Sequence, residues 1–482
     1  MKFLRIVVVG AAFVTFASVL PASASTTLVL QSAKEVTLPS GAHGLYQGYL
    51  PTLSCVSTGN CVAGGGYNNN AGNESGVILT ETKGTWRTPI TLKAPAGAAT
   101  AAANLTIESL SCGAIGNCAA VGEYQDQSGN SQGFVANEVR NVWKSPTKLA
   151  LPANALGDGQ DAFVRSVVCS SAGNCSAVGG YFDNHVAAPR SVGFDLVEVN
   201  GTWHRAVEIS FAKTTNFNPF VTTSQIACSS TGNCSAVGSF IDVNGVSQGF
   251  IINQVRGTWS TATTLTLPAN ASAYAGASLS EVACVSASCA VFGTYLTSTG
   301  ATEALSASDA NGTWLRANEL TMPVGAATNP HVFLYGFLGI ACASTGNCAA
   351  GGQYRDSAGE YEGFLVSDVN GVWKGAVELT LPAGGQSAGA NGGVVALSCP
   401  SSGNCRAGAA YLNGSGNYEA VIVAEDNGTW HQGTKVALPG GAATVGVDGG
   451  VYALVCPSIN ACTAAGSYLK TTTDYEGFTV SS

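Results

Sequence analysis

The chain has 482 residues with 20 Lys or Arg against 29 Asp or Glu, and its formal net charge is −9. Because it contains no run of basic residues, it lacks the positive surface with which proteins bind nucleic acid or anionic lipid, and we expect neither partner. Its 61 glycines punctuate short apolar runs rich in Val, Leu, Phe and Tyr that lack helical spacing, which predicts an all-β fold.

The N-terminal segment has the pattern of a secretory signal peptide. A basic start precedes an apolar run at 6–20, and small residues at 22–24 form a cleavage site. We therefore expect residues 1–24 to be removed and residues 25–482 to form a single domain that is secreted and extracellular. No later apolar run reaches the roughly 18 residues that a spanning helix needs, so we predict no membrane insertion.

The next segment, 25–39, looks like the end of a unit that occurs in full further along: SAKEVTLPS at 32–40 is close to GAVELTLPA at 375–383. The unit is marked by sixteen cysteines in eight pairs, whose first members stand 56 to 59 residues apart. A fixed period of this length indicates a solenoid, a propeller or an array. The pairs are Cys55 and Cys61, Cys112 and Cys118, Cys169 and Cys175, Cys228 and Cys234, Cys284 and Cys289, Cys342 and Cys348, Cys399 and Cys405, and Cys456 and Cys462.

Each unit contains the signals for four strands. The first strand has an apolar residue two positions before the first Cys, and the second has an aromatic residue six positions after the second Cys. The third begins at Gly-Phe or an equivalent pair. An Asn-Gly turn, a strong hairpin signal, then leads through Thr-Trp into the fourth strand, which ends at Leu-Pro. Four antiparallel strands in a unit of this length are typical of one blade of a β-propeller.

The spacing of Trp and Pro assigns the opening fragment to the last unit. In six of the seven units that have a Trp, Pro follows it by nine residues, and Leu30 stands nine residues before Pro39. The last unit has signals for three strands only before Ser482. We therefore predict that residues 25–39 form the outer strand of the last blade, beside 478–480, and close a ring of eight blades. Closure removes an unpaired sheet edge, whereas a linear solenoid would need capping repeats, and none is visible.

The cysteine pairs are predicted to be disulfides within each blade. Four or five residues separate the two members, which suits a hairpin that places them opposite one another. In an exported protein such pairs oxidise. Zinc would need further ligands, and no His recurs with the pairs, so we expect no metal site.

One hairpin resembles a known propeller motif. A carboxylate or amide stands five residues before each Trp, and the hairpin resembles the Asp-box of sialidase-type propellers, although Gly is one place closer to Trp here. The whole unit, SC-x-S-x-GNC-x-AVG-x-Y, is similar to repeats of exported bacterial proteins, mainly actinobacterial. In the Asp-box family the box is structural, so we interpret Glu198 and Trp203 as a cross-strand clamp. The equivalent residues are Glu81, Glu138, Glu198, Gln254, Asp309, Asp368 and Glu425.

The sequence offers no catalytic residue and no cofactor motif. The Phe/Tyr-Arg-Ile-Pro segment that sialidases use for their first arginine is absent, and so is the docking motif of quinone-dependent alcohol dehydrogenases. No Gly-rich segment introduces a helix that could hold a phosphate. We therefore predict no cofactor. A carbohydrate-active hydrolase or lyase is the alternative, because that chemistry needs only two suitably spaced carboxylates.

Departures from the repeat predict where a ligand binds. In a propeller the loops between blades and the loops between second and third strands share one face, here called the variable-loop face. On this face Tyr181 to Gly193 takes twelve residues where the other units take nine, and Pro323 to Cys342 takes 19 where the others take 16 or 17. Exposed aromatic side chains on such loops suit binding. The candidate binding residues are His185, Arg190, Phe217, Phe220, His331, Phe333, Tyr335 and Phe337.

The function that we favour is non-enzymatic. We expect an exported propeller that recognises a carbohydrate or a protein partner, such as a polysaccharide or a surface protein, through the variable-loop face. A purely structural envelope protein is a third class, which the absence of a ligand-sized pocket would favour.

Overall fold

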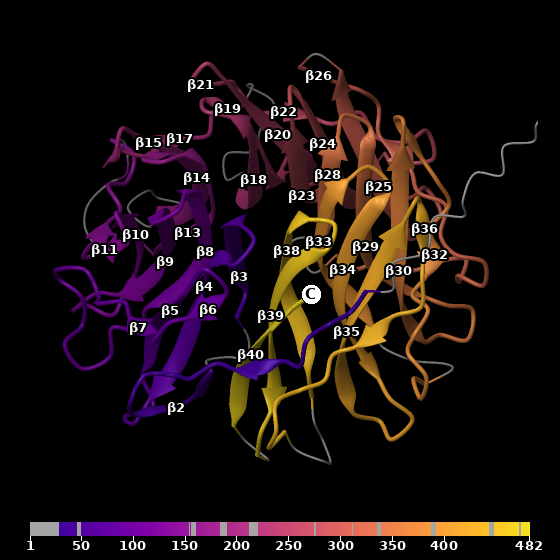
Figure 1. Ribbon diagram of the computed structural model, residues 1–482. Helices are drawn as coiled ribbons and strands as arrows, with labels where there is room; N and C mark the ends of the chain where they lie inside the picture. The colour runs from indigo at the N-terminus through magenta and orange to yellow at the C-terminus, as the bar shows by residue number, and fades with distance from the viewer. Residues whose placement is uncertain are drawn as a thin grey trace, which may run out of the picture.

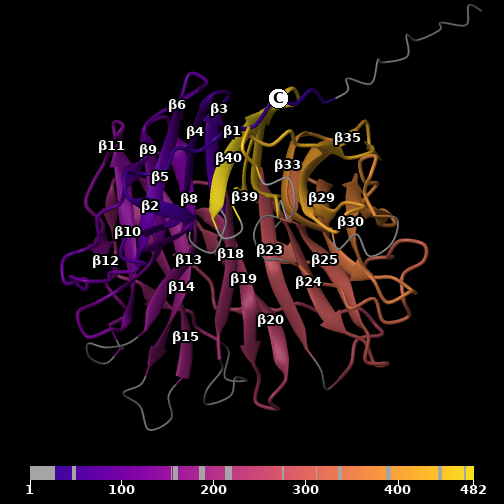
Figure 2. The ribbon, with the colours of Figure 1, turned by 90° about the horizontal axis from the view of Figure 1, so that it is seen from below.

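The computed structural model describes residues 28–482 apart from 46–49, 154, 156–160, 184–189, 212–219, 274–275, 311, 335–338, 387–391, 443–447 and 472–473. These residues form forty strands and no helix, and hence none that could cross a membrane. The strands make eight antiparallel sheets arranged as a ring, an eight-bladed β-propeller (Figure 1, Figure 2). The predicted fold class is confirmed.

The strands of each blade follow one another in chain order from the centre of the ring outward (Figure 1). The innermost strands are β3 (Thr52–Ser57), β8 (Thr106–Ala114), β13 (Ala162–Ser171), β18 (Thr222–Ser230), β23 (Ala277–Val285), β28 (Ile340–Ser344), β33 (Gly393–Ser401) and β38 (Gly450–Ser458). The second strands are β4 (Asn60–Asn69), β9 (Asn117–Gln125), β14 (Asn174–Asp183), β19 (Asn233–Ile241), β24 (Ser288–Leu296), β29 (Asn347–Arg355), β34 (Asn404–Leu412) and β39 (Ala461–Leu469). The third strands are β5 (Glu74–Thr82), β10 (Ser131–Val139), β15 (Arg190–Val199), β20 (Ser247–Val255), β25 (Thr302–Ala310), β30 (Tyr361–Val369), β35 (Tyr418–Asp426) and β40 (Tyr475–Ser481).

The outer strand is divided into two short segments in seven blades, and both segments pair with the third strand. The segments are β6 (Thr85–Trp86) and β7 (Ile90–Thr91), β11 (Val142–Trp143) and β12 (Thr147–Lys148), β16 (Thr202–Trp203) and β17 (Val207–Glu208), β21 (Thr258–Trp259) and β22 (Thr263–Thr264), β26 (Thr313–Trp314) and β27 (Asn318–Glu319), β31 (Val372–Trp373) and β32 (Val377–Glu378), and β36 (Thr429–Trp430) and β37 (Thr434–Lys435). In the first blade β2 (Ala42–Leu45) also pairs with β4.

The ring closes between the two ends of the chain. Strand β1 (Lys34–Glu35) pairs with β40 in the same register in which β12 pairs with β10, as the spacing of Leu30 and Pro39 predicts. Backbone hydrogen bonds extend this contact from Gln31, which donates to the Ser481 carbonyl at 2.9 Å, to Val36. The regular strand is shorter than the predicted segment 25–39, because only residues 34 and 35 complete the ladder pattern. The predicted signal peptide lies outside the described residues.

All sixteen cysteines form disulfides within their own blades, with Cα–Cα distances of 3.9 to 4.1 Å. Each bond joins the innermost strand of a blade to its second strand, so the two cysteines lie on either side of one hairpin. The bonds join Cys55 to Cys61, Cys112 to Cys118, Cys169 to Cys175, Cys228 to Cys234, Cys284 to Cys289, Cys342 to Cys348, Cys399 to Cys405, and Cys456 to Cys462.

The hairpin that carries each disulfide lies beside the turn between the third and outer strands of the same blade. In the third blade Gly201 donates to the Gly173 carbonyl at 2.8 Å. Both central residues of this Asn-Gly turn have positive φ, 50° at Asn200 and 81° at Gly201, as a two-residue hairpin requires. The disulfide hairpins and these turns therefore share one face, opposite the variable-loop face.

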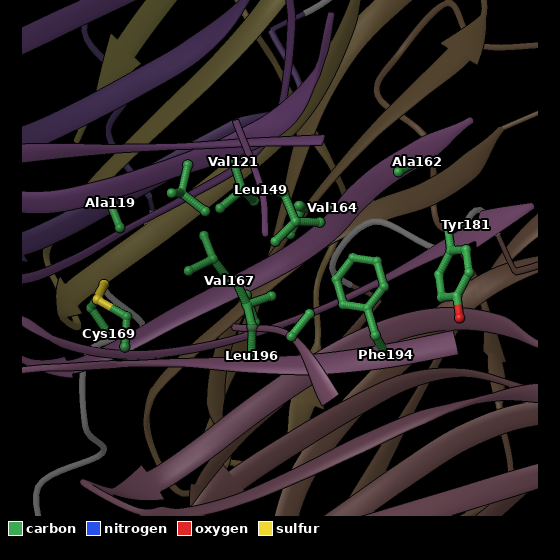
Figure 3. Packing of buried hydrophobic residues seen from close by; sticks show 14 of the residues in the cluster. Ala119, Val121, Leu149, Ala162, Val164, Val167, Cys169, Tyr181, Phe194 and Leu196 are labelled. Carbon is green, nitrogen blue, oxygen red and sulfur yellow. A yellow bond between two sulfur atoms is a disulfide. The ribbon is translucent and has the colours of Figure 1, made fainter. Parts of the chain in front are cut away.

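The hydrophobic core is divided among the spaces between neighbouring blades. Between the second and third blades Val121 and Leu149 pack against Val164, Phe194 and other side chains of the third blade (Figure 3). The phenylalanine at the start of the third strand is fully buried in several blades, because each sheet is covered on both faces by its neighbours. The core thus joins the blades side by side and leaves the two ends of the ring to the loops.

The box hairpin contacts the neighbouring blade as well as closing its own turn. Glu198 pairs with Trp203 across β15 and β16, as predicted. Between them lies the amide of Asn137 from the preceding blade, which donates through Nδ2 to Glu198 and accepts through Oδ1 from Trp203 Nε1 at 2.8 Å. We call this arrangement of acid, tryptophan and preceding polar residue a clasp.

Clasps occur at alternate junctions of the ring. Trp430 Nε1 donates to Ser367 Oγ at 2.9 Å, and that hydroxyl donates to Glu425. At the junction of the fourth and fifth blades Trp314 Nε1 donates to Asn253 Oδ1 at 3.4 Å, while the acid, Asp309, accepts from backbone N–H groups of its own blade, so only the tryptophan half of the clasp is present. In the intervening blades the buried indole nitrogens have no hydrogen-bond partner among the described residues; these are Trp143, Trp259 and Trp373.

Candidate functional site

Six of the eight innermost strands depart from regular pairing four residues before their first cysteine. In β8 the register shifts between Ile107 and Ser109, so Glu108 has no residue opposite, and β13 skips Arg165 in the same way. Such a bulge redirects the extra side chain. The second strand carries Gly opposite, because a Cβ at Gly122 would lie 1.9 Å from the Thr106 carbonyl oxygen. The other bulged residues are Ser224, Ser280, Val395 and Tyr452.

Bulged residues line a cavity of about 510 Å³ at the centre of the ring. It is bounded by the innermost strands of the first four blades and by Ser280 of the fifth. Arg165 Nη1 lies 2.9 Å from Glu108 Oε2, and the guanidinium carbon lies 4.9 Å from the centre of the Phe163 ring. The Arg165 side chain is still 46% exposed, so it can contact a ligand in this central cavity, which we call the channel.

A second cavity, of about 310 Å³, lies between the first and second blades on the variable-loop face. Glu108 lines both cavities, which therefore adjoin there. Three carboxylates and several hydroxyl and amide groups surround the second cavity. Its lining residues are Gly72, Glu74, Asn104, Thr106, Glu108, Glu123, Tyr124, Gln125 and Ser131. We call it the acidic pocket.

Burial changes the protonation of the acidic pocket. It raises the pKa of Glu74 to about 7, against the hydrogen bond that Thr106 donates, and the negative charges of Glu108 and Glu123 raise it further. Burial also raises the pKa of Glu108, while the positive charge of Arg165 acts in the opposite direction. Near neutral pH Glu74 is therefore partly protonated and can donate as well as accept a hydrogen bond.

The loop between the first two blades fixes the position of Glu74. Asn104, at φ 42°, accepts a hydrogen bond from the Glu74 backbone N–H at 3.2 Å and donates to Gln125 at 3.0 Å. Asp161 holds the start of the third strand in the second blade in the same way, and Asn329 does so in the fifth. A side chain of each such loop thus ties two blades together at the variable-loop face.

Two of the predicted residues lie near the third blade. Arg190 begins β15, and its guanidinium lies 3.5 Å from Asp183 and 3.8 Å from Glu208, so it is engaged in ion pairs of the blade itself. Phe220 is 53% exposed and lies at the entry to the fourth blade. The predicted residues His185 and Phe217 lie outside the described residues.

The other predicted group lies between the fifth and sixth blades. Phe333 is 48% exposed and makes a T-shaped contact with Tyr361, with ring centres 5.6 Å apart. His331 lies beside Asn329, with 3.3 Å between its Nε2 and the amide nitrogen. The predicted Tyr335 and Phe337 lie outside the described residues. The two aromatic groups and the acidic pocket therefore occupy three sectors of one face.

The sequence prediction missed the acidic pocket and the bulged residues of the channel. The repeat does contain a pattern that indicates the bulged residues. Two positions before the first Cys the residue is always apolar, whereas four positions before it the residue changes in size, charge and polarity from unit to unit. A position that varies inside an otherwise regular unit indicates a side chain outside the repeated core.

One group of described residues has the proximity that a metal site needs: Cys169, Cys175 and Glu198. The two sulfur atoms are joined in a disulfide and offer no thiolate. This group therefore belongs to the hairpin and not to a metal centre.

No protein-family model matches the chain, and comparison with curated proteins gave no significant match. Similar solved structures include a puromycin-hydrolysing peptidase of Mycobacterium tuberculosis, at 12% identity and a TM-score of 0.46, over 92% of this chain and 61% of that one. They also include a Trypanosoma rangeli sialidase, at 10% identity and a TM-score of 0.38, over 81% of this chain and 57% of that one. A PL25 ulvan lyase is similar at 10% identity and a TM-score of 0.43, over 92% of this chain and 95% of that one. This chain thus spans less than two thirds of the peptidase and of the sialidase. The fold assignment rests on the strand pairing and not on these similarities.

Proposed function

We propose that the protein is an exported, non-enzymatic binding protein that recognises a carbohydrate through its variable-loop face. The observation that carries this proposal is the junction of the acidic pocket and the channel at Glu108. Ligand sites are concave and place a few polar groups where they fix the orientation of the ligand. The presence of a ligand-sized, polar cavity on the variable-loop face also favours a binding role over a purely structural one.

The groups that surround Glu108 suit the hydroxyls of a sugar. Glu123 accepts a hydrogen bond from Ser131 at 2.7 Å and, as a carboxylate, has further lone pairs for ligand hydroxyls. Partly protonated Glu74 can donate to a ring or hydroxyl oxygen. The channel adds the Arg165 guanidinium, and the exposed rings of Phe220 and Phe333 extend the surface around the same face. Aromatic faces and charge-assisted hydrogen bonds together give affinity and orientation.

Export is part of the proposal and is supported by two observations. Disulfides form and persist in oxidising compartments, and all sixteen cysteines are paired. The N-terminal apolar run has the pattern of a signal peptide. The whole repeat unit, SC-x-S-x-GNC-x-AVG-x-Y, is similar to repeats of exported bacterial proteins, which is consistent with export.

The alternative function is a carbohydrate-active hydrolase or lyase. The raised pKa of Glu74, about 7, favours it, because a general acid must hold its proton near neutral pH while a second carboxylate is ionised. In that case Glu74 donates the proton, and Glu108 or Glu123 acts as base or nucleophile. A sialidase-like reaction is not supported, since Arg165 is the one arginine among the described residues that line the two cavities.

A glycan array followed by calorimetry tests both functions. Glu108→Gln and Glu123→Gln should weaken the glycan that binds best by at least roughly tenfold, the effect of one lost charge-assisted hydrogen bond. The control is Glu360→Gln, which removes an exposed charge from a turn outside both cavities. If the protein instead cleaves the glycan, it releases reducing ends as a hydrolase or unsaturated sugars as a lyase. Release by the parent protein that is lost in the Glu74→Gln variant would establish the enzyme. Binding that survives both pocket variants would refute this site.

A further inference from the structure

The junction between the eighth and first blades contains a third cavity, of about 170 Å³. It opens at the face of the disulfide hairpins, because Thr58 of the first hairpin, Gly84 of the adjacent turn and Cys462 line it. Glu81 and Trp86 of the first box hairpin form one wall, and Ser481 and Lys34 stand on the other side of the junction. We call this cavity the seam pocket.

The seam pocket occupies the place of a clasp. By the register of the repeat, Ser481 corresponds to Asn137 and Ser367, which reach the acid and the tryptophan of the following blade at their own junctions. At the seam that contact is not made. Glu81 is only 5% exposed, yet its Oε2 has no hydrogen-bond partner among the described residues.

The composition of the eighth blade explains why the clasp is open. Leu30 stands where the other blades have Trp, and Ser482 stands where they have the carboxylate or amide. Ser482 satisfies the hairpin locally, since its hydroxyl accepts from the Cys462 N–H at 3.0 Å. Ser481 and Ser482 have short side chains and line the cavity beside Glu81 and Trp86. Leu30 does not line it and packs in the core between the seventh and eighth blades.

We propose that the seam pocket binds one neutral sugar ring, with a hydroxyl donating to Glu81 Oε2 and the ring lying against Trp86. This is a second site, on the face opposite the acidic pocket, and it does not depend on the proposed function of that pocket. The cavity has room for the six-membered ring itself, since an engineered cavity of about 150 Å³ takes up benzene, and the remaining sugar substituents would lie at its opening on the disulfide-hairpin face.

The chemistry of the walls selects a neutral hydroxylic ligand. Six hydroxyl side chains line the cavity; they belong to Ser32, Thr58, Thr463, Thr479, Ser481 and Ser482. One cation, Lys34, and one anion, Glu81, face each other across it, so neither an acidic nor a basic ligand is favoured by net charge. Burial raises the pKa of Glu81, and the positive charge of Lys34 acts in the opposite direction. A sugar hydroxyl meets the open carboxylate oxygen at a lower desolvation cost than an ion would.

The test uses the full-length protein and five monosaccharides as probes: glucose, galactose, mannose, fucose and N-acetylglucosamine. Binding is followed by calorimetry and by saturation-transfer NMR. At least one sugar should bind, and Glu81→Gln should weaken it by about tenfold or more because a charged acceptor is replaced by a neutral one. Glu138→Gln is the matched control, since Glu138 occupies the same position in the second blade and is also buried.

A second variant separates binding from folding. Ser481→Asn recreates the polar residue of the clasp and should fill the pocket, so that it abolishes sugar binding while the melting temperature stays equal or rises. Glu108→Gln should leave the seam site unaffected. If no sugar binds at concentrations of about 50 mM, well above a millimolar Kd, the pocket holds only water and the proposal is wrong. If Glu108→Gln removes the binding and Glu81→Gln does not, the sugar binds in the acidic pocket; the seam site is then refuted and the proposed function is retained.

Discussion

Trp203 in the third blade donates its indole N–H to Asn137 in the second blade across 2.8 Å, and the same amide donates to Glu198. The hydrogen bonds join side chains that are about one repeat apart in the chain. The box hairpin of the third blade therefore stabilises this junction, because a buried carboxylate and a partly buried indole both hydrogen-bond to one residue of the preceding repeat.

Asn137→Ala should destabilise the protein. It leaves Glu198 and Trp203 without their partner in a buried position, which costs roughly 1–3 kcal/mol. The matched control is Thr80→Ala, at the equivalent position of a junction where the indole of Trp143 has no partner. Thermal and denaturant unfolding should show a clear loss for Asn137→Ala and a change within about 0.5 kcal/mol for Thr80→Ala. Equal effects of the two variants would contradict the role of the clasp.

Val36→Asp should disrupt ring closure. Val36 is 5% exposed in the core between the last and first blades, and a charge there has no partner to offset its desolvation. We expect a loss of about 3 kcal/mol or more in the free energy of unfolding. Val29→Asp is the control, because Val29 is 74% exposed in the same segment. If both variants melt like the parent, β1 does not hold the ring closed.

Stability should fall as the pH rises from about 5 to 8. Burial raises the pKa of Glu74 and Asp195 to about 7 and that of Asp368 to about 6, above their values of 4.5 and 3.8 in an unfolded chain. In this window the folded state binds more protons than the unfolded state, so deprotonation favours unfolding. Melting curves at pH 5, 6, 7 and 8 measure the fall.

Asp195→Asn should reduce this fall, since Asp195 lies in the place that Val135 and Ile251 take in the neighbouring blades and is 5% exposed. Asp126→Asn is the control. Hydrogen bonds from Asn130 and Ser128 hold the pKa of Asp126 below its usual value, so its charge does not change in this window. A melting temperature that rises with pH would show that these acids are not buried as described.

The aromatic residues of the variable-loop face should contribute to binding. The paired variants Phe217→Ala with Phe220→Ala, and Phe333→Ala with Tyr335→Ala, should each weaken the glycan of the variable-loop face by roughly threefold to tenfold, the effect of losing a stacking contact. Melting should change little because Phe220 and Phe333 are about half exposed. Leu315→Ala, an exposed residue between the outer-strand segments β26 and β27, is the control. Binding unchanged in both pairs would remove these loops from the site.

The fold could be predicted because its signals recur. Each disulfide follows from the fixed separation of two cysteines in one hairpin, and ring closure follows from the shared spacing of Leu30 with Pro39 and of Trp with Pro. These are local patterns, and they are repeated often enough that a single departure from the repeat, such as Leu30 at the position of Trp, can be recognised. The Glu198 and Trp203 pair is local in the same sense.

The site could be predicted only in part, because its residues come from different repeats. The alternation of residues along β8 does not reveal the bulge at Glu108, because one extra residue leaves the apolar pattern before and after it in the strand intact. The partner of a box acid lies in the preceding blade, where Asn137 has no local signal. The sequence predicts Arg190 as a candidate binding residue, and it could not show that Asp183 and Glu208 form ion pairs with it, because their proximity depends on how the third blade pairs.

The pairing of β1 with β40 sets an order of assembly. Lys34 and Thr479 belong to opposite ends of the chain, so the entropy of closing this contact is overcome only after the other blades have formed. Until then the third strand of the last blade exposes its outer edge, together with the apolar surface that Leu30 later covers. The slowest step in folding, and the state most prone to associate with another chain, should therefore be the almost complete ring that lacks its last strand.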